Sequence, residues 1–343
     1  MPLLASWLGI GSPTKKLDTY PRSSHDSLTI VEKADILQSQ QTDAREEKAH
    51  WLVQSIVNTH TELLKLPHLR PGPAINKLLG NLVSICSEIH DQEIVNKAVL
   101  PSLRQICAQS ESCLELHWAE HILEGQTQEE VIERLESFPY YENYEDLTRL
   151  EVCSILSATK VAPRRVAFIG SGPLPLTSLC LLHALKNDVV VRSLTQPATT
   201  STTATDSTAN QEPIVLNVDY DEAAISASLK LSLALGGRGK GMEFICAEAT
   251  SASASRDLTE FDVVYMAALV GITQTDKEKI MLEVVSRMRK GALLVVRSSW
   301  GLRTCLYPEV DLATEILLKR LEPCVVVHPY NQVVNSVIVA RVR

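Results

Sequence analysis

The sequence predicts an α/β protein in which an all-helical region is followed by a doubly wound, mostly parallel sheet. Residues 45–160 show a helical spacing of apolar residues and no strand-like alternation. After Pro163, short β-branched runs alternate with helical patterns, which is typical of βαβ units covered by helices on both faces. The 343 residues are enough for two domains. We therefore expect a flexible tail at 1–44, a helical cap domain at 45–160 and a sheet domain at 161–343.

The region before residue 160 is expected to contain only helices. Its first residues mix prolines, serines and charges without a sustained period, so we expect a loose tail or one short helix there. Pro67, Pro71 and Pro73 interrupt the helical pattern that follows, and Pro101 is expected to break or kink a later helix. The helices are predicted at 44–66, 74–89, 91–107, 111–124, 129–137 and 144–160.

After residue 160, β-branched apolar runs predict strands, and the periodic segments between them predict helices. The strands are expected at 165–169, at 189–194 or 214–218, and at 243–247, 262–267, 292–297, 324–328 and 336–341. The helices are expected at 174–186, 222–235, 276–289 and 312–321. Only residues 329–335 separate the last two strands. That spacing favours an antiparallel strand at the sheet edge, as in the class I methyltransferase variant of the Rossmann-like fold.

Residues 195–212 depart from this pattern. The segment, TQPATTSTTATDSTANQE, is nearly all threonine, serine, alanine and glutamine. It has too little apolar surface to offset the entropy that it would lose on ordering. We expect a flexible insertion without a catalytic role.

The composition argues against several classes of function. Apolar residues make up 45% of the chain and charged residues 22%, the balance of a globular protein. With 33 basic and 41 acidic residues, the net charge of −8 argues against broad nucleic-acid binding, which needs a dense basic surface. No apolar run is long enough to span a bilayer, and the opening MPLLASWLGIGSP lacks the positive start of a signal peptide. We expect a small-molecule substrate and neither nucleic-acid nor membrane partners, with the oligomeric state left open, a homodimer included.

The cysteines indicate a reducing environment. The chain has 8 cysteines and no C-x-x-C pair. Most lie in apolar, periodic segments, which favours buried free thiols in the cytoplasm over disulfides. His117 and His121 share a helical face, but no third ligand is evident, and we expect no metal on the protein.

The strongest local signal follows the first predicted strand. The segment VAFIGSGPLP runs from an apolar strand through Gly-x-Gly into a helix opened by proline. Glycines let the backbone turn sharply and approach a ligand closely, and proline suits a first helical turn. The pattern predicts a nucleotide or nucleoside ligand. Its expected contacts are Gly170, Ser171, Gly172 and Pro173. A serine hydrolase is not expected, because the Gly-x-Ser-x-Gly pattern is absent.

Three further turns are expected to meet the same ligand, because ligands of open α/β sheets bind outside the carboxyl ends of the strands. Asp219 ends the second strand, where a carboxylate can accept both hydroxyl protons of a ribose, and Asp221 is the expected helix N-cap. Glu248 follows the third strand, where such folds contact adenine. The turn after the fourth strand would face the reacting end of the ligand. It supplies Ala267, Ala268 and Leu269.

Two arginines follow the fifth strand. Arg297 and Arg303 flank the segment SSWG. A guanidinium can hold a substrate carboxylate by two parallel hydrogen bonds. A structural or surface salt bridge is the alternative that the sequence leaves open.

The helical region has its own polar cluster. Glu111 and Glu115 are spaced so that two carboxylates lie one turn apart on one helix face. The segment FPYYENY then packs Tyr140, Tyr141 and Tyr144 together just before the sheet region. Aromatic rings grouped in this way can surround a cationic ligand, and packing between domains is the alternative.

Several of these segments closely resemble those of nicotianamine synthases. They are FPYYENY, VAFIGSGPLPLTS, DVVYMAALVG, GALLVVRS and, near the C-terminus, HP followed by VNSVIVAR. The resemblance covers roughly residues 75–343, whereas the long N-terminal tail and the threonine-rich insertion depart from the family pattern. Phe168 stands where ordinary methyltransferases place an acid, which agrees with this family.

The resemblance implies an enzyme that uses S-adenosylmethionine as its substrate without transferring the methyl group. Three molecules would be joined by aminocarboxypropyl transfer to give nicotianamine, a metal chelator, with release of methylthioadenosine. The protein would then mainly position an amine and remove its proton. Candidate helpers are Glu111 or Glu115 with Tyr140, Tyr141 or Tyr144. The alternatives are a small-molecule methyltransferase using S-adenosylmethionine and a non-catalytic nucleoside-binding protein of the same fold.

Overall fold

The computed structural model describes residues 30–87, 100–188, 191, 212–250 and 257–343. The chain consists of two compact units, Met1–Lys48 and Ala49–Arg343. The site and the sheet described below belong to the second unit, and the predicted boundary near residue 160 stays a prediction. Four predicted features lie wholly or mostly outside the described residues. They are the start of the tail, the first part of the helix at 91–107, the alternative strand at 189–194 and the insertion at 195–212.

Helices precede the sheet, as predicted. They are α1 (Ile30–Leu64), α2 (Pro73–Ser87), α3 (Leu100–Leu123), α4 (Gln128–Glu136) and α5 (Tyr141–Ala158). The first helix begins at Ile30, within the segment that the sequence assigned to a tail. Pro101 lies in the first turn of α3, where its missing N–H costs no helical hydrogen bond. The predicted break at Pro101 stays a prediction, because the residues directly before Leu100 lie outside the described part of the chain. The helices predicted to end at Cys107 and begin at Glu111 are one helix.

The strands form a single sheet in the described part of the chain. They are β1 (Arg165–Ile169), β2 (Ile214–Asp219), β3 (Met242–Cys246), β4 (Val263–Met266), β5 (Leu293–Ser298), β6 (Leu321–Val327) and β7 (Ser336–Val342). The 7 strands lie in the order β3-β2-β1-β4-β5-β7-β6, with β1 to β5 parallel. The predicted antiparallel strand exists, but β7 pairs with both β5 and β6 and leaves β6 at the edge. The prediction is therefore corrected in one point: β7, the antiparallel strand, lies next to the edge strand and is not itself the edge.

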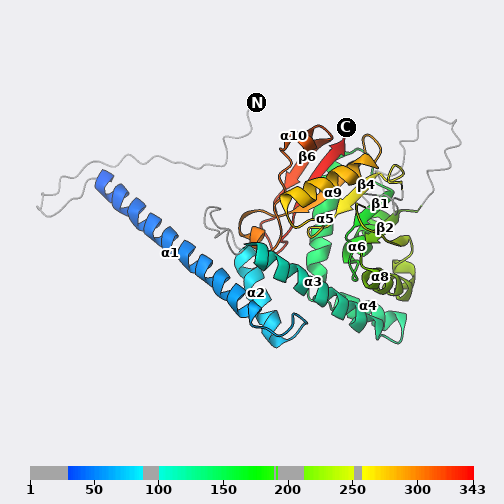
Figure 1. Cartoon of the computed structure of the whole chain (residues 1–343), viewed down its shortest axis with the longest axis horizontal. Helices are drawn as coiled ribbons and strands as arrows, with labels where there is room; N and C mark the ends of the chain where they lie inside the picture. Colours follow the sequence, from blue (N-terminus) through cyan, green and yellow to red (C-terminus); the bar gives the residue numbers. More distant parts are fainter. Residues whose placement is uncertain (1–29, 88–99, 189–190, 192–211, 251–256) are drawn as a thin grey trace, which may run out of the picture. The chain divides into compact units, whose positions relative to one another are not determined.

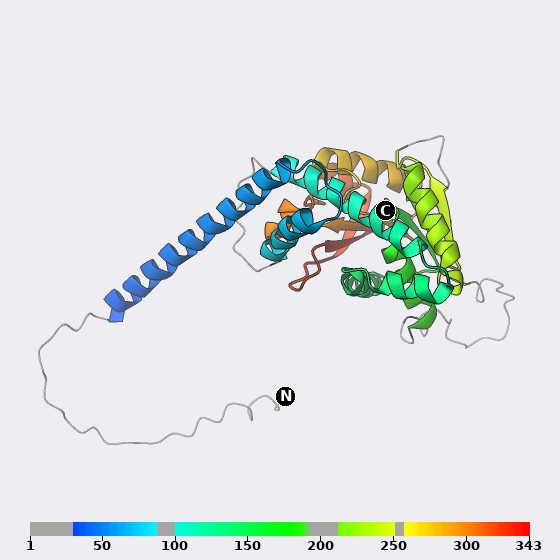
Figure 2. The ribbon, with the colours of Figure 1, turned by 90° about the horizontal axis from the view of Figure 1, so that it is seen from below.

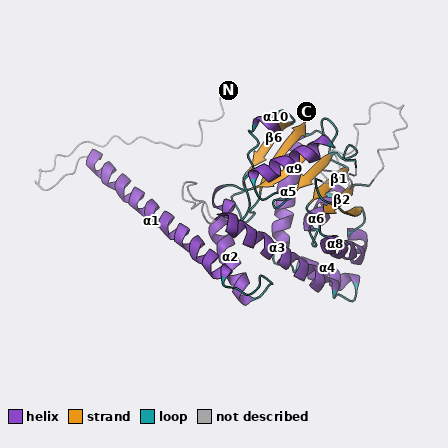
Figure 3. Ribbon diagram, viewed as in Figure 1, coloured by secondary structure: helices purple, strands orange, loops and turns teal. Residues whose placement is uncertain are grey.

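Helices cover both faces of the sheet, which confirms the doubly wound α/β class (Figure 3). The helices between the strands are α6 (Leu176–Asn187), α8 (Glu222–Ala234), α9 (Gln274–Ser286) and α10 (Glu315–Leu318). Side chains alternate along a strand. Ala167 and Ile169 of β1 therefore pack on the face covered by α9, and Val166 and Phe168 pack on the opposite face against α5 and α6.

The helical region has a core that includes a segment from the connection between β5 and β6. Leu52 of α1, Leu82 of α2 and Leu103 of α3 are fully buried. They pack with Leu302, which lies in the short helix η4 (Gly301–Cys305) directly after β5. Figures 1 and 2 show α2 and α3 beside this part of the chain. The insertion of η4 into the helical core holds α3 next to the carboxyl end of β5.

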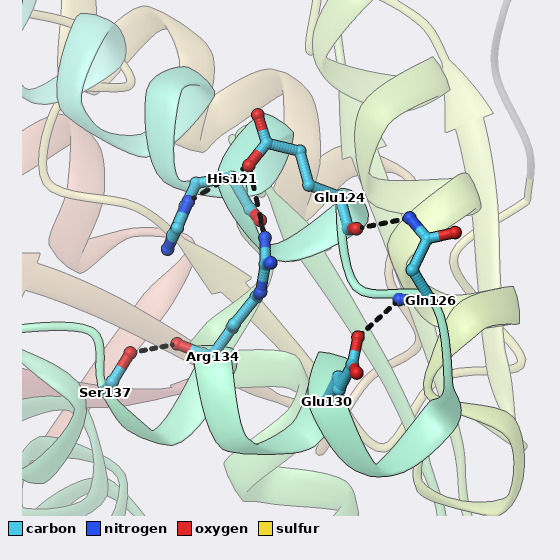
Figure 4. A network of polar contacts seen from close by, with 6 residues as sticks. All are labelled: His121, Glu124, Gln126, Glu130, Arg134 and Ser137. Atoms are coloured by element: carbon cyan, nitrogen blue, oxygen red, sulfur yellow. Dashed lines mark hydrogen bonds and ion pairs between the residues drawn. The ribbon is translucent and has the colours of Figure 1, made fainter.

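A polar network joins the end of α3 to α4 (Figure 4). Arg134 donates to the carbonyl of His121 at 2.7 Å and to the carboxylate of Glu124 at 3.1 Å. The ring of His121 lies 3.4 Å from the same carboxylate, and His117 is exposed to solvent. Of the two histidines noted in the sequence, His121 is thus part of a helix-to-helix connection.

The thiols are free, as predicted, but most are not buried. All 8 cysteines are unpaired, and of these Cys86 and Cys305 are buried while Cys153, Cys246 and Cys324 are exposed. Position on an apolar helix or strand therefore did not predict burial. Among the helices in the described ranges, none has the length and apolar character that crossing a membrane requires.

Candidate active site

The glycine turn lies at the carboxyl end of β1. Gly170 and Gly172 have φ of +80° and +67°, a left-handed backbone that favours glycine. The amide of Gly170 donates to the carbonyl of Val218 at the end of β2, at 2.7 Å. A Cβ on Gly170 would collide with side chains of Ala267 and Val270 after β4. The absence of a side chain therefore lets the turns after β1 and β4 approach each other.

Asp219 connects the glycine turn to the end of β2. Its Oδ2 accepts from the amide of Gly172 at 2.9 Å, and its Oδ1 accepts from the amide of Asp221 at 3.1 Å. Each carboxylate oxygen has a second lone pair, so both can also accept from ligand hydroxyls. Asp221 caps α8 by accepting from the amide of Ala223 at 2.9 Å, which confirms the predicted N-cap.

The other residues predicted to contact a nucleoside lie at the same edge of the sheet. Ser171 and Pro173 are buried, and the Ser171 hydroxyl has no hydrogen-bond partner among the described residues. Glu248 is exposed after β3. A pocket between the turn after β3 and the start of α9 is lined by Thr250 and Ile272, among others.

Lys277 of α9 fixes the turn after β4 and was missed by the sequence analysis. The side chain is fully buried, and its Nζ donates to the carbonyl of Ala268 at 2.6 Å and to that of Ala267 at 3.4 Å. Burial lowers the pKa of this amine to about 7. Leu269 follows these two alanines, so the predicted contacts after β4 belong to a turn that a buried lysine holds in place.

Glu115 reaches from α3 to the glycine turn. Its Oε1 accepts from the hydroxyl of Tyr144 on α5 at 3.0 Å. A Cβ on Gly172 would lie only 2.6 Å from Oε2 of Glu115. The structure thus places a carboxylate of the helical region directly against the turn at which the sequence predicts the ligand.

Glu111 lies one helical turn before Glu115 and has its own tyrosine partner. The hydroxyl of Tyr307 donates to Oε2 of Glu111 at 2.9 Å. Tyr307 was not among the predicted site residues. It is 196 positions from Glu111 in the sequence, and no local pattern marks it.

The surroundings raise the pKa of both carboxylates. Burial raises the pKa of Glu115 well above its usual value, and the charge of Glu111 raises it further. Burial also raises the pKa of Glu111, against the opposing effects of the Tyr307 hydrogen bond and Arg297. Burial raises the pKa of Tyr144 and Tyr307 well above 10, so both phenols remain hydrogen-bond donors. Such carboxylates are suited to accept a proton from an amine.

The tyrosine cluster contributes Tyr144 to this arrangement. Tyr140 is 39% exposed, and its ring packs edge-on against Phe138 with centroids 5.8 Å apart. Tyr141 is half-buried beside α6, where burial raises its pKa to about 12. Both rings therefore have packing contacts, and the predicted help of these two tyrosines to the glutamates stays a prediction.

The two predicted carboxylate-binding arginines are occupied by protein groups. Arg297 forms a buried ion pair with Glu151, donating from Nε at 2.7 Å and from Nη2 at 3.2 Å. Arg303 is buried and donates to the carbonyls of Ser87 and Asn331 at 3.1 and 2.9 Å. A buried guanidinium needs such partners to offset its desolvation. Arg297 thus forms the structural salt bridge that the sequence left open as the alternative to substrate binding, whereas the predicted role of Arg303 stays a prediction.

The ion pair of Arg297 and Glu151 lies beside Phe168, the apolar residue two positions before the glycine turn. The guanidinium carbon lies 5.3 Å from the centroid of the Phe168 ring. On β4, Tyr265 stacks on the same ring with centroids 5.4 Å apart. Phe168 thus belongs to the packing beneath the turn.

The sheet order, the glycine turn and the acid at the end of β2 define an α/β protein of the class I methyltransferase type. A sequence model of the family described as "Nicotianamine synthase protein" matches residues 45–343. The chain belongs to this family.

Plant relatives agree with the family match. The chain is 32% identical over 299 residues to "Nicotianamine synthase 2" of Arabidopsis thaliana, covering 84% of this chain and 83% of that protein. It is 33% identical over 305 residues to "Nicotianamine synthase 8" of Hordeum vulgare, covering 87% and 84%. Among solved structures, MtNAS in complex with MTA and tNA is similar at a TM-score of 0.63 and 20% identity, covering 86% of this chain and 98% of that one. At that identity the structural likeness shows the fold.

Proposed function

We propose that this protein is a nicotianamine synthase. It condenses three S-adenosylmethionine molecules by aminocarboxypropyl transfer and releases methylthioadenosine. The observation that carries the proposal is the position of Glu115, a carboxylate with a raised pKa, directly against Gly172 of the glycine turn. A simple methyl transfer needs no base at this point when the acceptor is already nucleophilic, whereas an amino acid nucleophile arrives as an ammonium and must lose a proton.

The residues at the sheet edge fit S-adenosylmethionine as the substrate. In the turn from Gly170 to Pro173, the unpartnered Ser171 hydroxyl offers a hydrogen bond. We assign the ribose hydroxyls to Asp219, whose oxygens retain free lone pairs. We assign the adenine to the region of Glu248 and the neighbouring pocket. The turn containing Ala267, Ala268 and Leu269 would then face the reacting aminocarboxypropyl arm.

Glu115 is the proposed base and Tyr144 the residue that orients it. Glu115 takes a proton from the α-ammonium of the acceptor, and the free amine attacks the γ-carbon of the donor. The bond from that carbon to sulfur breaks, its electron pair stays on sulfur, and neutral methylthioadenosine leaves. The new secondary ammonium then loses its proton to solvent. A second transfer of the same kind lengthens the chain, and intramolecular attack of an amine on the remaining γ-carbon closes the ring and releases the third methylthioadenosine. Because the sulfonium is already a good leaving group, positioning and proton removal are the tasks left to the protein.

The proposal includes a cellular setting. Nicotianamine is a chelator, so metal binding is assigned to the product and the protein serves metal-chelator biosynthesis. The 8 free thiols support a cytoplasmic location.

The direct test is to incubate the purified protein with S-adenosylmethionine alone and to analyse the products by mass spectrometry. We expect methylthioadenosine together with nicotianamine. Formation of S-adenosylhomocysteine only when an acceptor is added would indicate a methyltransferase instead. Unchanged S-adenosylmethionine would contradict the proposal.

A variant pair tests the assignment of the base. Glu115→Gln should retain S-adenosylmethionine binding and lower kcat by about 10²–10⁴-fold, the usual contribution of a general base. Glu120→Gln is the matched control, since Glu120 is an exposed carboxylate on the same helix. Equal rates for the two variants would refute the role of Glu115.

A further inference from the structure

The site contains two glutamate–tyrosine pairs, and only one of them lies against the glycine turn. Glu115 with Tyr144 lies against Gly172. Glu111 with Tyr307 lies one helical turn earlier on α3. Only the first pair is placed against the turn assigned to the substrate, so a second base at Glu111 is not required by the geometry.

We propose that Tyr307 and Glu111 are positioning residues for Glu115: the Tyr307 hydroxyl fixes the Glu111 carboxylate, which lies one helical turn from Glu115 on α3. This inference rests on the proposed function, in which Glu115 is the base. Glu111 presents a negative charge to Glu115 from one turn away, and Tyr307 keeps that charge in place by donating a hydrogen bond to it. Glu115 consequently holds its proton more strongly and is better matched to an amine.

The backbone of Tyr307 is anchored so that its hydroxyl stays on Glu111. Its amide donates to the carbonyl of Arg303 at 3.1 Å, within the turn that ends η4. Its carbonyl accepts from the hydroxyl of Ser299 at 2.7 Å, just beyond β5. The phenol is therefore positioned jointly by the sheet and by the segment that enters the helical core.

The other charged or titratable groups around Glu115 do not replace this role. Asp219 on β2 acts in the same direction as Glu111 but more weakly. Arg297 on β5 opposes it, and its charge is already compensated by Glu151. Cys107 on α3 faces Glu111 as a neutral thiol, because burial raises its pKa to about 12. Tyr144 donates to Glu115 and is likewise neutral.

The test is the dependence of kcat on pH, with saturating S-adenosylmethionine, for Glu111→Gln, Tyr307→Phe and the double variant. The wild-type rate should rise with pH as Glu115 loses its proton. Glu111→Gln should move this rise to lower pH by on the order of one unit, because a like charge has been removed. Tyr307→Phe should move it in the same direction by less, since the neighbouring carboxylate becomes easier to protonate. The double variant should match Glu111→Gln alone, because Tyr307 acts through Glu111.

Tyr265→Phe is the matched control for loss of a buried phenol hydroxyl. Tyr265 is fully buried, and its hydroxyl has no partner among the described residues. This variant should leave the pH of half-maximal rate unchanged. Near-UV circular dichroism and S-adenosylmethionine binding establish that each variant is folded.

Several outcomes would overturn the inference. The first is that kcat of Glu111→Gln or Tyr307→Phe rises at the same pH as kcat of the wild type, or at a higher pH. The second is that the shifts of the two single variants add in the double variant. A wild-type rate without such a rise would do so as well. Failure of the proposed function looks different: the wild-type protein would form no methylthioadenosine, or Glu115→Gln would keep the full rate.

Discussion

Replacing Gly172 by alanine separates backbone strain from displacement of the proposed base. Alanine at φ +67° costs about 1–2 kcal/mol of stability, because the left-handed conformation brings Cβ close to the following carbonyl. The new Cβ would also lie 2.6 Å from Oε2 of Glu115, whereas ordinary contacts begin at about 3.4 Å. The carboxylate must therefore retreat by about 0.8 Å. A misplacement of about 1 Å can lower a rate by roughly 10²-fold, so we expect kcat to fall by about 10- to 100-fold.

The control is Gly291→Ala, at a glycine before β5. Gly291 has φ of +83°, and a Cβ there meets nothing within 4 Å. Urea unfolding should show a similar loss of stability for both variants, while the release of methylthioadenosine should fall only for Gly172→Ala. In a Glu115→Gln background, Gly172→Ala should lower kcat little further. Full activity of Gly172→Ala, or an equal loss of activity in Gly291→Ala, would refute the reasoning.

Two further predictions concern buried charges. Arg297→Met should lower the free energy of unfolding by about 3–5 kcal/mol, because it leaves Glu151 buried and unpaired. The double variant Arg297→Met with Glu151→Leu should recover much of this loss. Urea unfolding of both variants measures the two changes. The pKa of Lys277 is about 7 in the folded chain and near 10.4 in the unfolded chain. Between these two pH values the unfolded chain therefore binds more protons than the folded chain. The free energy of unfolding of the wild-type protein should consequently rise with pH in this range, by at most about 1.4 kcal/mol per pH unit. Lys277→Met should lack this contribution in urea unfolding between about pH 7 and 9, and equal slopes for the two proteins would contradict the reasoning.

The sequence predicted those parts of the fold and site that depend on neighbours along the chain. The apolar run of β1 is bounded by a proline before it and a glycine after it, and its predicted limits match Arg165–Ile169. The cap formed by Asp221 is local as well. Both features follow from backbone geometry that a few adjacent residues determine.

Features that depend on distant partners were missed or misassigned. The local sequence around an arginine at the end of a buried strand does not distinguish a substrate partner from a protein partner. The partner of Arg297 is Glu151, which lies 146 positions earlier in the chain. Tyr307 gains its role only because η4 folds back beside α3. The position of β7 follows from pairing with both β5 and β6, and the short connection before it did not distinguish an edge strand from an interior one.

The interior position of β7 has a consequence for the order in which the sheet can assemble. On the ribosome, β1 to β5 can pair as they emerge, but β6 has no described neighbour until β7 has been made. Until then β5 and β6 both present open edges, which are prone to pair with other chains. The insertion of β7 therefore pairs the open edges of β5 and β6 in one step. A chain interrupted before Ser336 would have an incomplete sheet with both of these edges unpaired.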